Sequence, residues 1–173
     1  MSVPAKVQVL LEGHKLIMAA FPDDQVVGLW SKATEAFTDS SSTPRSCNGQ
    51  FRDLYEGGRL AATAILAAAG YKAVGQDHHR SAIIAAAELS PDPVAEAFYT
   101  LEGARGNRHD TNYGSADVVE KDDVDELRAA LETLMVEGAK HLRSMRPEAK
   151  HRIRITRPKR RKVDGGRTDD EEA

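Results

Sequence analysis

The densest group of side chains able to do chemistry lies in the stretch ARGNRHDTNY, residues 104–113. If this stretch continues a helix, one face of it carries positions i, i+3, i+4 and i+7, which are Arg105, Arg108, His109 and Asn112. Guanidinium groups bind phosphate oxygens through paired hydrogen bonds, and a histidine titrating near neutral pH can move a proton in phosphodiester cleavage. The alternative is a solvated helix end with salt bridges, and the local residues favour it because the two nearby glycines weaken a helix.

Two further groups of candidate residues stand earlier in the chain. His78 and His79 are adjacent, so on a helix they point about 100° apart and make a poor ligand pair for one metal ion. Tyr55 and Arg59 are four residues apart, which is typical of a packed phenol beside a guanidinium that reaches solvent. Of these four residues, only Arg59, which stands in mid-helix before an apolar run, indicates a buried polar network. We expect all four to support the main site, and we expect no metal and no cofactor.

Motifs for most other chemistries are missing. The chain has no GxxxxGK[ST] loop, no GxGxxG after a strand, no HExxH and no GxSxG. These absences argue against nucleotide hydrolysis, dinucleotide binding, zinc proteolysis and a nucleophile elbow. The single cysteine, Cys47, excludes an internal disulfide and a thiolate zinc site. The acidic cluster at 122–126 is more typical of a helix N-terminus than of a magnesium site.

Charge is distributed in three unlike blocks. The 173 residues include 24 Lys and Arg against 27 Asp and Glu, a formal charge of −3. Residues 1–139 hold 12 basic and 21 acidic residues (−9), residues 140–162 hold 11 basic and one acidic (+10), and residues 163–173 hold one basic and five acidic (−4). This pattern indicates an acidic body, a basic arm that a polyanion can neutralise, and an acidic terminus that can compete for the arm.

The basic arm is a second candidate site for nucleic acid. Lysine and arginine contacts to phosphate supply salt-dependent affinity without sequence preference. Within the arm, basic residues alternate with Ile153 and Ile155, a pattern compatible with a short strand or an extended arm. The residues expected to contact phosphate are Lys150, Arg152, Arg154, Arg157, Lys159, Arg160 and Arg161.

Hydrophobic spacing predicts an all-α protein, a compact bundle of five to six helices. Helix-forming residues dominate, and apolar residues recur at spacings of three and four. A chain of this size suits one domain, residues 1–147, followed by a basic and then acidic tail, residues 148–173. The expected helices cover about 5–20, 23–37, 50–69, 77–89, 93–105 and a stretch from Asp122 or Asp123 to Pro147, with a loop at 38–49. No apolar run approaches the roughly 20 residues that span a bilayer, so we expect a cytoplasmic protein without a membrane partner.

The order of these features resembles the HEPN family, the higher-eukaryote and prokaryote nucleotide-binding domain. The resemblance spans roughly residues 51–142 and rests on two blocks, DLYEGGRLAATAILAAAGYKAVGQDHHRSAI and ARGNRHDTNYG. It implies a bundle of four or five helices that commonly dimerises. It also implies either a metal-independent endoribonuclease or a non-catalytic RNA- or nucleotide-binding partner.

The family signature is an arginine, then a polar residue, then a histidine after four to six intervening positions. Arg108 matches the arginine and His109 the polar residue, whereas Tyr113 stands where the final histidine would be. The resemblance implies that Arg108 orients the scissile phosphate. A phenol with a pKa near ~10 is a poor proton acceptor at neutral pH. Either His109 or one of the His78–His79 pair replaces the missing histidine, or the protein is a member of the family that binds RNA without cleaving it.

Two main functions follow from these observations. One is a dimeric, non-catalytic or weakly catalytic bundle in which the Arg105/Arg108/His109 face and the basic arm grip RNA phosphates. The other is an endoribonuclease, a toxin or defence effector with an antitoxin-like regulatory partner, whose paired motifs meet across a dimer cleft. A third possibility is a protein-interaction adaptor whose arm binds an acidic partner. We narrowly prefer the ribonuclease family, with activity left open.

Overall fold

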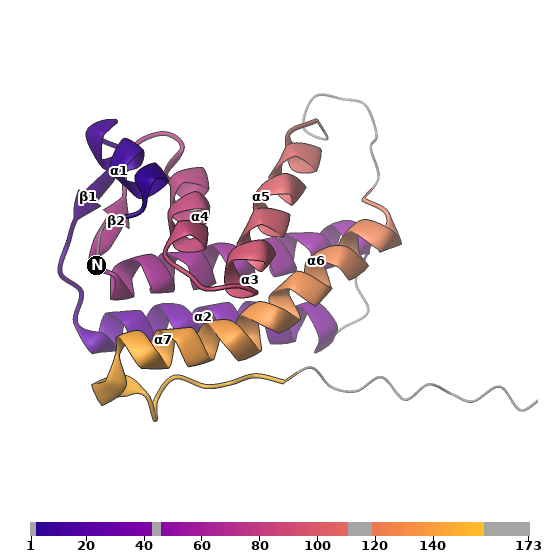
Figure 1. Ribbon diagram of the computed structural model, residues 1–173. Coiled ribbons are helices and arrows are strands. Elements are labelled where there is room, and N and C mark those ends of the chain that lie inside the picture. The colour runs from indigo at the N-terminus through magenta and orange to yellow at the C-terminus, as the bar shows by residue number, and fades with distance from the viewer. Residues whose placement is uncertain (1–2, 43–45, 111–118, 158–173) are drawn as a thin grey trace, which may run out of the picture.

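The computed structural model describes residues 3–42, 46–110 and 119–157, and within these it gives no side-chain placement for residues 42 and 105–110. The fold is an α-helical bundle, as predicted (Figure 1). The helices are α1 (Ala5–Glu12), α2 (Asp23–Ser42), α3 (Cys47–Ala68), α4 (His78–Glu88), α5 (Val94–Asp110), α6 (Lys121–Thr133) and α7 (Ala139–Met145). No helix in the described part of the chain is both long enough and apolar enough to cross a bilayer.

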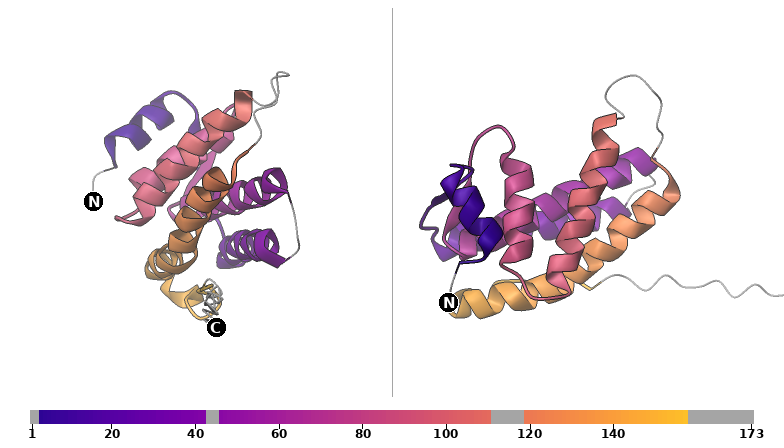
Figure 2. Two further views of the ribbon diagram at one scale, coloured as in Figure 1. Left: turned by 90° about the vertical axis from the view of Figure 1, so that its right-hand side faces the viewer. Right: turned by 45° about the horizontal axis from the view of Figure 1, so that its top comes forward.

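Helices α2 and α3 form an antiparallel pair at the base of the bundle, and α4 and α5 pack across it (Figure 2). Two adjacent glycines allow these close approaches. A Cβ on Gly57 would lie 3.2 Å from the carbonyl oxygen of Ala33 on α2, and a Cβ on Gly58 would lie 2.7 Å from the Cδ2 atom of Leu101 on α5. The small residues of α3 therefore make it the central helix, in agreement with the prediction from its alanine-rich sequence.

Helices α6 and α7 are joined by a π-helical turn, Leu134–Gly138, and together span residues 121–145. The N-cap is Glu120, not Asp122 or Asp123 as expected: Glu120 and Asp123 form a capping box, with the backbone N–H of Glu120 donating to the Asp123 carboxylate at 3.0 Å. At the π-turn, Gly138 lies against the Trp30 ring. A Cβ on Gly138 would lie 3.3 Å from the Cη2 atom of Trp30. The wider turn accommodates this buried indole.

The prediction of one helix over residues 5–20 is wrong beyond Glu12. The chain turns at Gly13 and His14, and His14 adopts a positive φ of 52°. Residues Leu16–Met18 then form strand β1, which pairs antiparallel with strand β2, Tyr71–Ala73. The partner strand lies more than fifty residues away, so the local apolar spacing that suggested a helix contained no signal for this pairing.

The expected loop at 38–49 is shorter in the structure. Helix α2 continues to Ser42, and α3 begins at Cys47 after Ser46, whose side chain accepts a hydrogen bond of 3.2 Å from the backbone N–H of Gly49. Serine and threonine in this stretch satisfy helix ends, as N-caps do, so their abundance alone did not define a loop. Helix α5 likewise extends past the expected end near Arg105 to Asp110.

Residues 148–157, the described part of the chain after Pro147, lie against the helical body. A 3-10 turn, Pro147–Ala149, is followed by an irregular segment in which Ile153 is fully buried in the main core. The Trp30 indole N–H donates to the backbone carbonyl of Arg154 at 2.9 Å. The alternation that suggested a strand reflects Ile153 and Ile155 packing against the core while Arg152 and Arg154 are exposed. The segment as far as Thr156, whose backbone N–H donates to the carbonyl of Met135, thus packs against the helices.

Candidate nucleic-acid interface

The stretch that carried the phosphate-binding hypothesis is the C-terminal end of α5. Because the backbone is helical through Asp110, Arg105, Arg108 and His109 occupy positions i, i+3 and i+4 of one helix. Their side chains lie outside the described part of the structure, as do residues Asn112 and Tyr113 altogether. The hypothesis required that this stretch be helical, and the backbone is helical as far as Asp110.

The middle of α5 lies beside the beginning of α4. One turn before Arg105, the Glu102 carboxylate accepts a hydrogen bond of 2.8 Å from Nε of Arg80, two residues after His78 in α4. This pair joins the two stretches that the sequence analysis linked only through a family resemblance. The His78–His79 pair thus lies in the turn of α4 that contacts α5 one turn before Arg105.

Arg59 on α3 is the centre of a polar group that reaches His79 on α4. Its Nε donates to the Glu56 carboxylate at 2.7 Å, a second and shorter bond joins its Nη2 to the same carboxylate, and its Nη1 lies 3.4 Å from Nδ1 of His79. The hydrogen bonds to Glu56, more than any other factor, raise the pKa of Arg59 above its usual value. Since a guanidinium only donates, Nδ1 of His79 is the acceptor in this contact, and the proton of the neutral ring is on Nε2.

His78 and His79 make different contacts although their rings lie close together. The ring centroids are 3.9 Å apart with the planes tilted by 51°. Nδ1 of His78 lies 2.9 Å from the carbonyl oxygen of Gly75, so His78 is the donor there, whereas His79 faces Arg59. Among the described residues no group of three histidine, cysteine, aspartate or glutamate side chains is placed to hold a metal ion.

Tyr55 lies one turn before Arg59 on α3 and is buried in the main core. Its place there confirms the interpretation of a packed phenol beside a half-buried guanidinium. Tyr55 is therefore a structural neighbour of Arg59 and is not exposed to a ligand.

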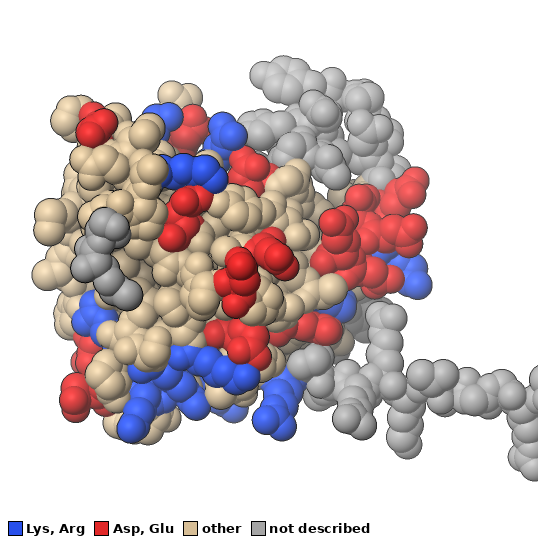
Figure 3. Space-filling model, viewed as in Figure 1, with Lys and Arg blue, Asp and Glu red and all other residues tan. Residues whose placement is uncertain are grey.

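The basic segment from Arg143 to Arg157 forms a strip along the lower edge of the molecule (Figure 3). Three of its arginines form hydrogen bonds or ion pairs with other parts of the described chain. Nε of Arg143 donates to the carbonyl of Ile153 at 2.9 Å, Nη1 of Arg146 lies 3.1 Å from the Asp23 carboxylate, and Nη2 of Arg152 lies 2.6 Å from the Asp24 carboxylate. Arg152 was expected to contact phosphate, but in the structure it is paired with Asp24.

Three other cations of the strip face solvent. Lys150, Arg154 and Arg157 are exposed, and none has an ion pair within the described residues. Lys159, Arg160 and Arg161 lie outside those residues. The described strip thus offers three uncompensated positive charges from a segment that contains one acid, Glu148.

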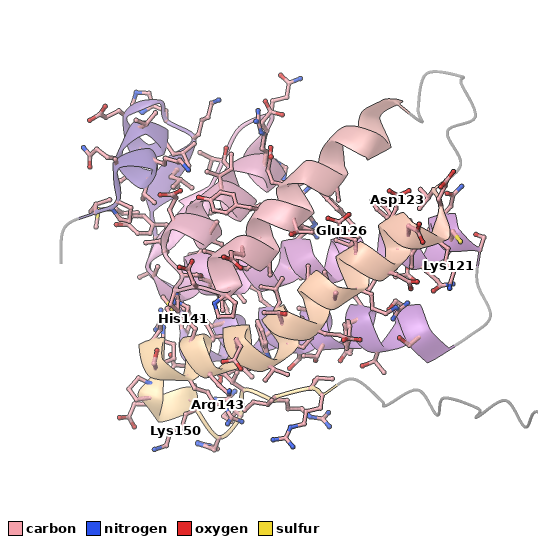
Figure 4. The ribbon with its side chains drawn as sticks, turned by 45° about the vertical axis from the view of Figure 1, so that its right-hand side comes forward. Lys121, Asp123, Glu126, His141, Arg143 and Lys150 are labelled. Carbon is pink, nitrogen blue, oxygen red and sulfur yellow. The ribbon has the colours of Figure 1, made fainter. Side chains whose placement is uncertain are left out.

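The right-hand end of the molecule in the view of Figure 3, where α6 begins, is acidic. Asp123 and Glu126 point toward α5 and, with Gly103 and Ala104, line a small hollow of about 160 Å³ (Figure 4). Carboxylates repel phosphate, so this hollow is not suited to a polyanion.

Comparison with protein-family models, with curated proteins and with solved structures found no match.

Sequence reasoning missed one set of polar residues, which line a larger pocket between α2, α3, β2 and α4. They include Gln25, Lys32 and Lys72. A signal existed for the α2 part, because Gln25, Gly28, Leu29 and Lys32 recur at helical spacing on one face. The contribution of β2 had no such signal.

Proposed function

We propose that this protein is an RNA-associated, HEPN-like helical bundle that binds RNA mainly through phosphate contacts. The observation that carries the proposal is the solvent-facing trio Lys150, Arg154 and Arg157, held on a strip that the core anchors through Ile153. Anchoring lowers the entropic cost of presenting these cations, because the backbone beneath them is already ordered. The order of the helices and the Arg105/Arg108/His109 positions on α5 add a second phosphate-binding face.

Binding of this kind is expected to be strongly salt-dependent and weakly sequence-specific. Phosphate neutralisation releases counterions, and the slope of log K against log salt reports the number of contacts. Aromatic residues make up 5% of the chain, so few side chains are available to stack on unpaired bases.

The salt dependence of RNA binding tests the strip. For single-stranded RNA, replacing Lys150, Arg154 and Arg157 with glutamine should lower the slope by about 2, since each phosphate contact contributes about 0.7. The matched control replaces the paired cations Lys121 and Lys140 with glutamine and should leave the slope unchanged. An unchanged slope in the first variant would remove the strip from the mechanism, and failure to retain RNA near physiological salt would favour the protein-binding adaptor.

A second candidate function is metal-independent endoribonuclease activity, and the helical continuity of α5 to Asp110 favours it. In this account Arg108 holds the scissile phosphate and a histidine, His109 or one of the His78–His79 pair, accepts the 2′-hydroxyl proton. Attack by that oxygen on phosphorus expels the 5′-oxygen and leaves a 2′,3′-cyclic phosphate. Tyr113 in place of the family's histidine favours the non-catalytic alternative. Homodimerisation and an antitoxin-like regulatory partner belong to this candidate function.

Incubation of the purified protein with RNA in EDTA separates the two functions. Cleavage that is lost in both Arg108→Ala and His109→Ala would support the nuclease. Retention of RNA without cleavage, weakened by Arg108→Ala, would support binding alone. Cleavage that survives both substitutions would indicate a contaminating nuclease and contradict the assignment of these residues.

A further inference from the structure

A second pocket lies between α2, α3, β2 and the first turns of α4. Its volume is about 520 Å³, within the range of 300–1,000 Å³ that is typical of small-molecule sites. It is separate from the exposed trio of the basic strip, because none of Lys150, Arg154 and Arg157 lines it.

The walls of this pocket are mainly apolar. Aromatic rings come from Phe21, ahead of α2, and Tyr71 on β2, while Leu29 and Leu66 contribute aliphatic surface. Gly28 on α2 has no atom within 4 Å of the position of a Cβ, so its place in the lining is open space. An apolar or aromatic ligand body would find surface to bury on several sides.

All the charged groups that line the pocket are cationic. Lys32 comes from α2, Arg59 from α3 and Lys72 from β2, and His78 adds an imidazole from α4. Arg59 is already paired with Glu56. Lys32 and Lys72 are exposed and have no ion pair among the residues that the structure describes. No carboxylate lines the pocket, so two ammonium groups remain uncompensated at an apolar cavity.

We infer that this pocket binds an amphipathic organic anion, a molecule with an apolar or aromatic body and one carboxylate, sulfonate or phosphate group. The body would lie against Phe21, Leu66 and Tyr71, and the anionic group would pair with Lys32 and Lys72. Both halves are needed: an apolar body without charge would leave the ammonium groups unpaired, and a small inorganic anion would leave the apolar walls in contact with water.

Fluorescence of 8-anilinonaphthalene-1-sulfonate, an aromatic body carrying one sulfonate, tests this inference in the full-length protein. The wild type should bind one molecule per chain, and dodecanoate should displace it whereas dodecanol should not. Replacing Lys32 and Lys72 with glutamate should weaken binding at least about tenfold, which corresponds to about 1.4 kcal/mol. The matched control, Lys121→Glu combined with Lys140→Glu, makes the same change of charge at two residues that do not line the pocket and should bind as the wild type does.

A second pair of variants tests the cavity without touching its charges. Gly28→Phe would place a ring in the pocket and should abolish binding, whereas Gly28→Ala should retain it. Circular dichroism and thermal unfolding establish that each variant is folded. Absence of binding by the wild type, equal displacement by dodecanol, or binding unaffected by both the lysine and the Gly28→Phe changes would each overturn the inference. Sedimentation that reveals a dimer lost in Gly28→Phe would assign the pocket to a second copy of the chain and would also overturn it.

Discussion

The indole N–H of Trp30 donates a hydrogen bond of 2.9 Å to the backbone carbonyl of Arg154, 124 residues later in the chain. Trp30 is buried on α2, whereas Arg154 belongs to the irregular segment after the last helix. The bond lies one residue from Ile153, which is itself in the main core. The basic strip is thus attached to the body by a buried side chain and a backbone contact.

Replacing Ile153 with alanine should destabilise the protein by about 2–4 kcal/mol, because truncating a buried isoleucine loses transfer free energy and leaves a cavity. The matched control is Ile17→Ala, since Ile17 is 44% exposed whereas Ile153 is 0% exposed. The control should change the free energy of unfolding by less than about 0.5 kcal/mol. Urea unfolding measures both, and equal effects would mean that the strip is not anchored.

The glycine at 58 should be intolerant of alanine. A Cβ there would lie 2.7 Å from Cδ2 of the buried Leu101, so the variant should lose about 1–3 kcal/mol through overpacking. The cost should shrink in a Leu101→Ala background, which removes the opposing methyl groups. Gly103→Ala is the control, because nothing lies within 4 Å of its Cβ position, and it should stabilise α5 by up to about 1 kcal/mol. Additive effects of the Gly58 and Leu101 substitutions would contradict the contact.

Stability should fall as the pH is lowered through the range in which His141 titrates. Burial lowers the pKa of His141 below its usual 6.5, against the opposing effect of its hydrogen bond to the carbonyl of Leu89 at 3.1 Å. The folded state therefore binds a proton less readily than the unfolded state. The contribution of His141 is fully present above the unfolded pKa of about 6.5 and is lost as the pH falls below it toward the folded pKa.

Urea midpoints at pH 7.5 and pH 5.5 check this prediction. His141→Gln, whose amide can still donate to Leu89, should lose less stability between the two pH values than the wild type does. His151→Gln is the control, since His151 is exposed, and it should keep the pH dependence of the wild type. A His141→Gln variant with the pH dependence of the wild type would exclude His141 as its source.

The local sequence was sufficient to predict the helical class and the position of most helices. The small residues of α3 and the glycine at 70, which adopts a φ of +83°, act within a turn or two of their own position. Helical spacing and end signals are properties of neighbouring residues, so they can be read without knowing the fold. The same applies to the charge blocks and to the helical spacing of Arg105, Arg108 and His109.

What depended on the tertiary structure was every contact between distant segments. The pairing of Leu16 with Ala73, the contact of Arg59 with His79 and the pairing of Arg152 with Asp24 join segments from 20 to 128 residues apart. Only the packed chain determines which lysines and arginines are neutralised and which are left facing solvent or a pocket. Composition counts charges, but charge pairing depends on distances of a few ångströms that the three-dimensional packing sets.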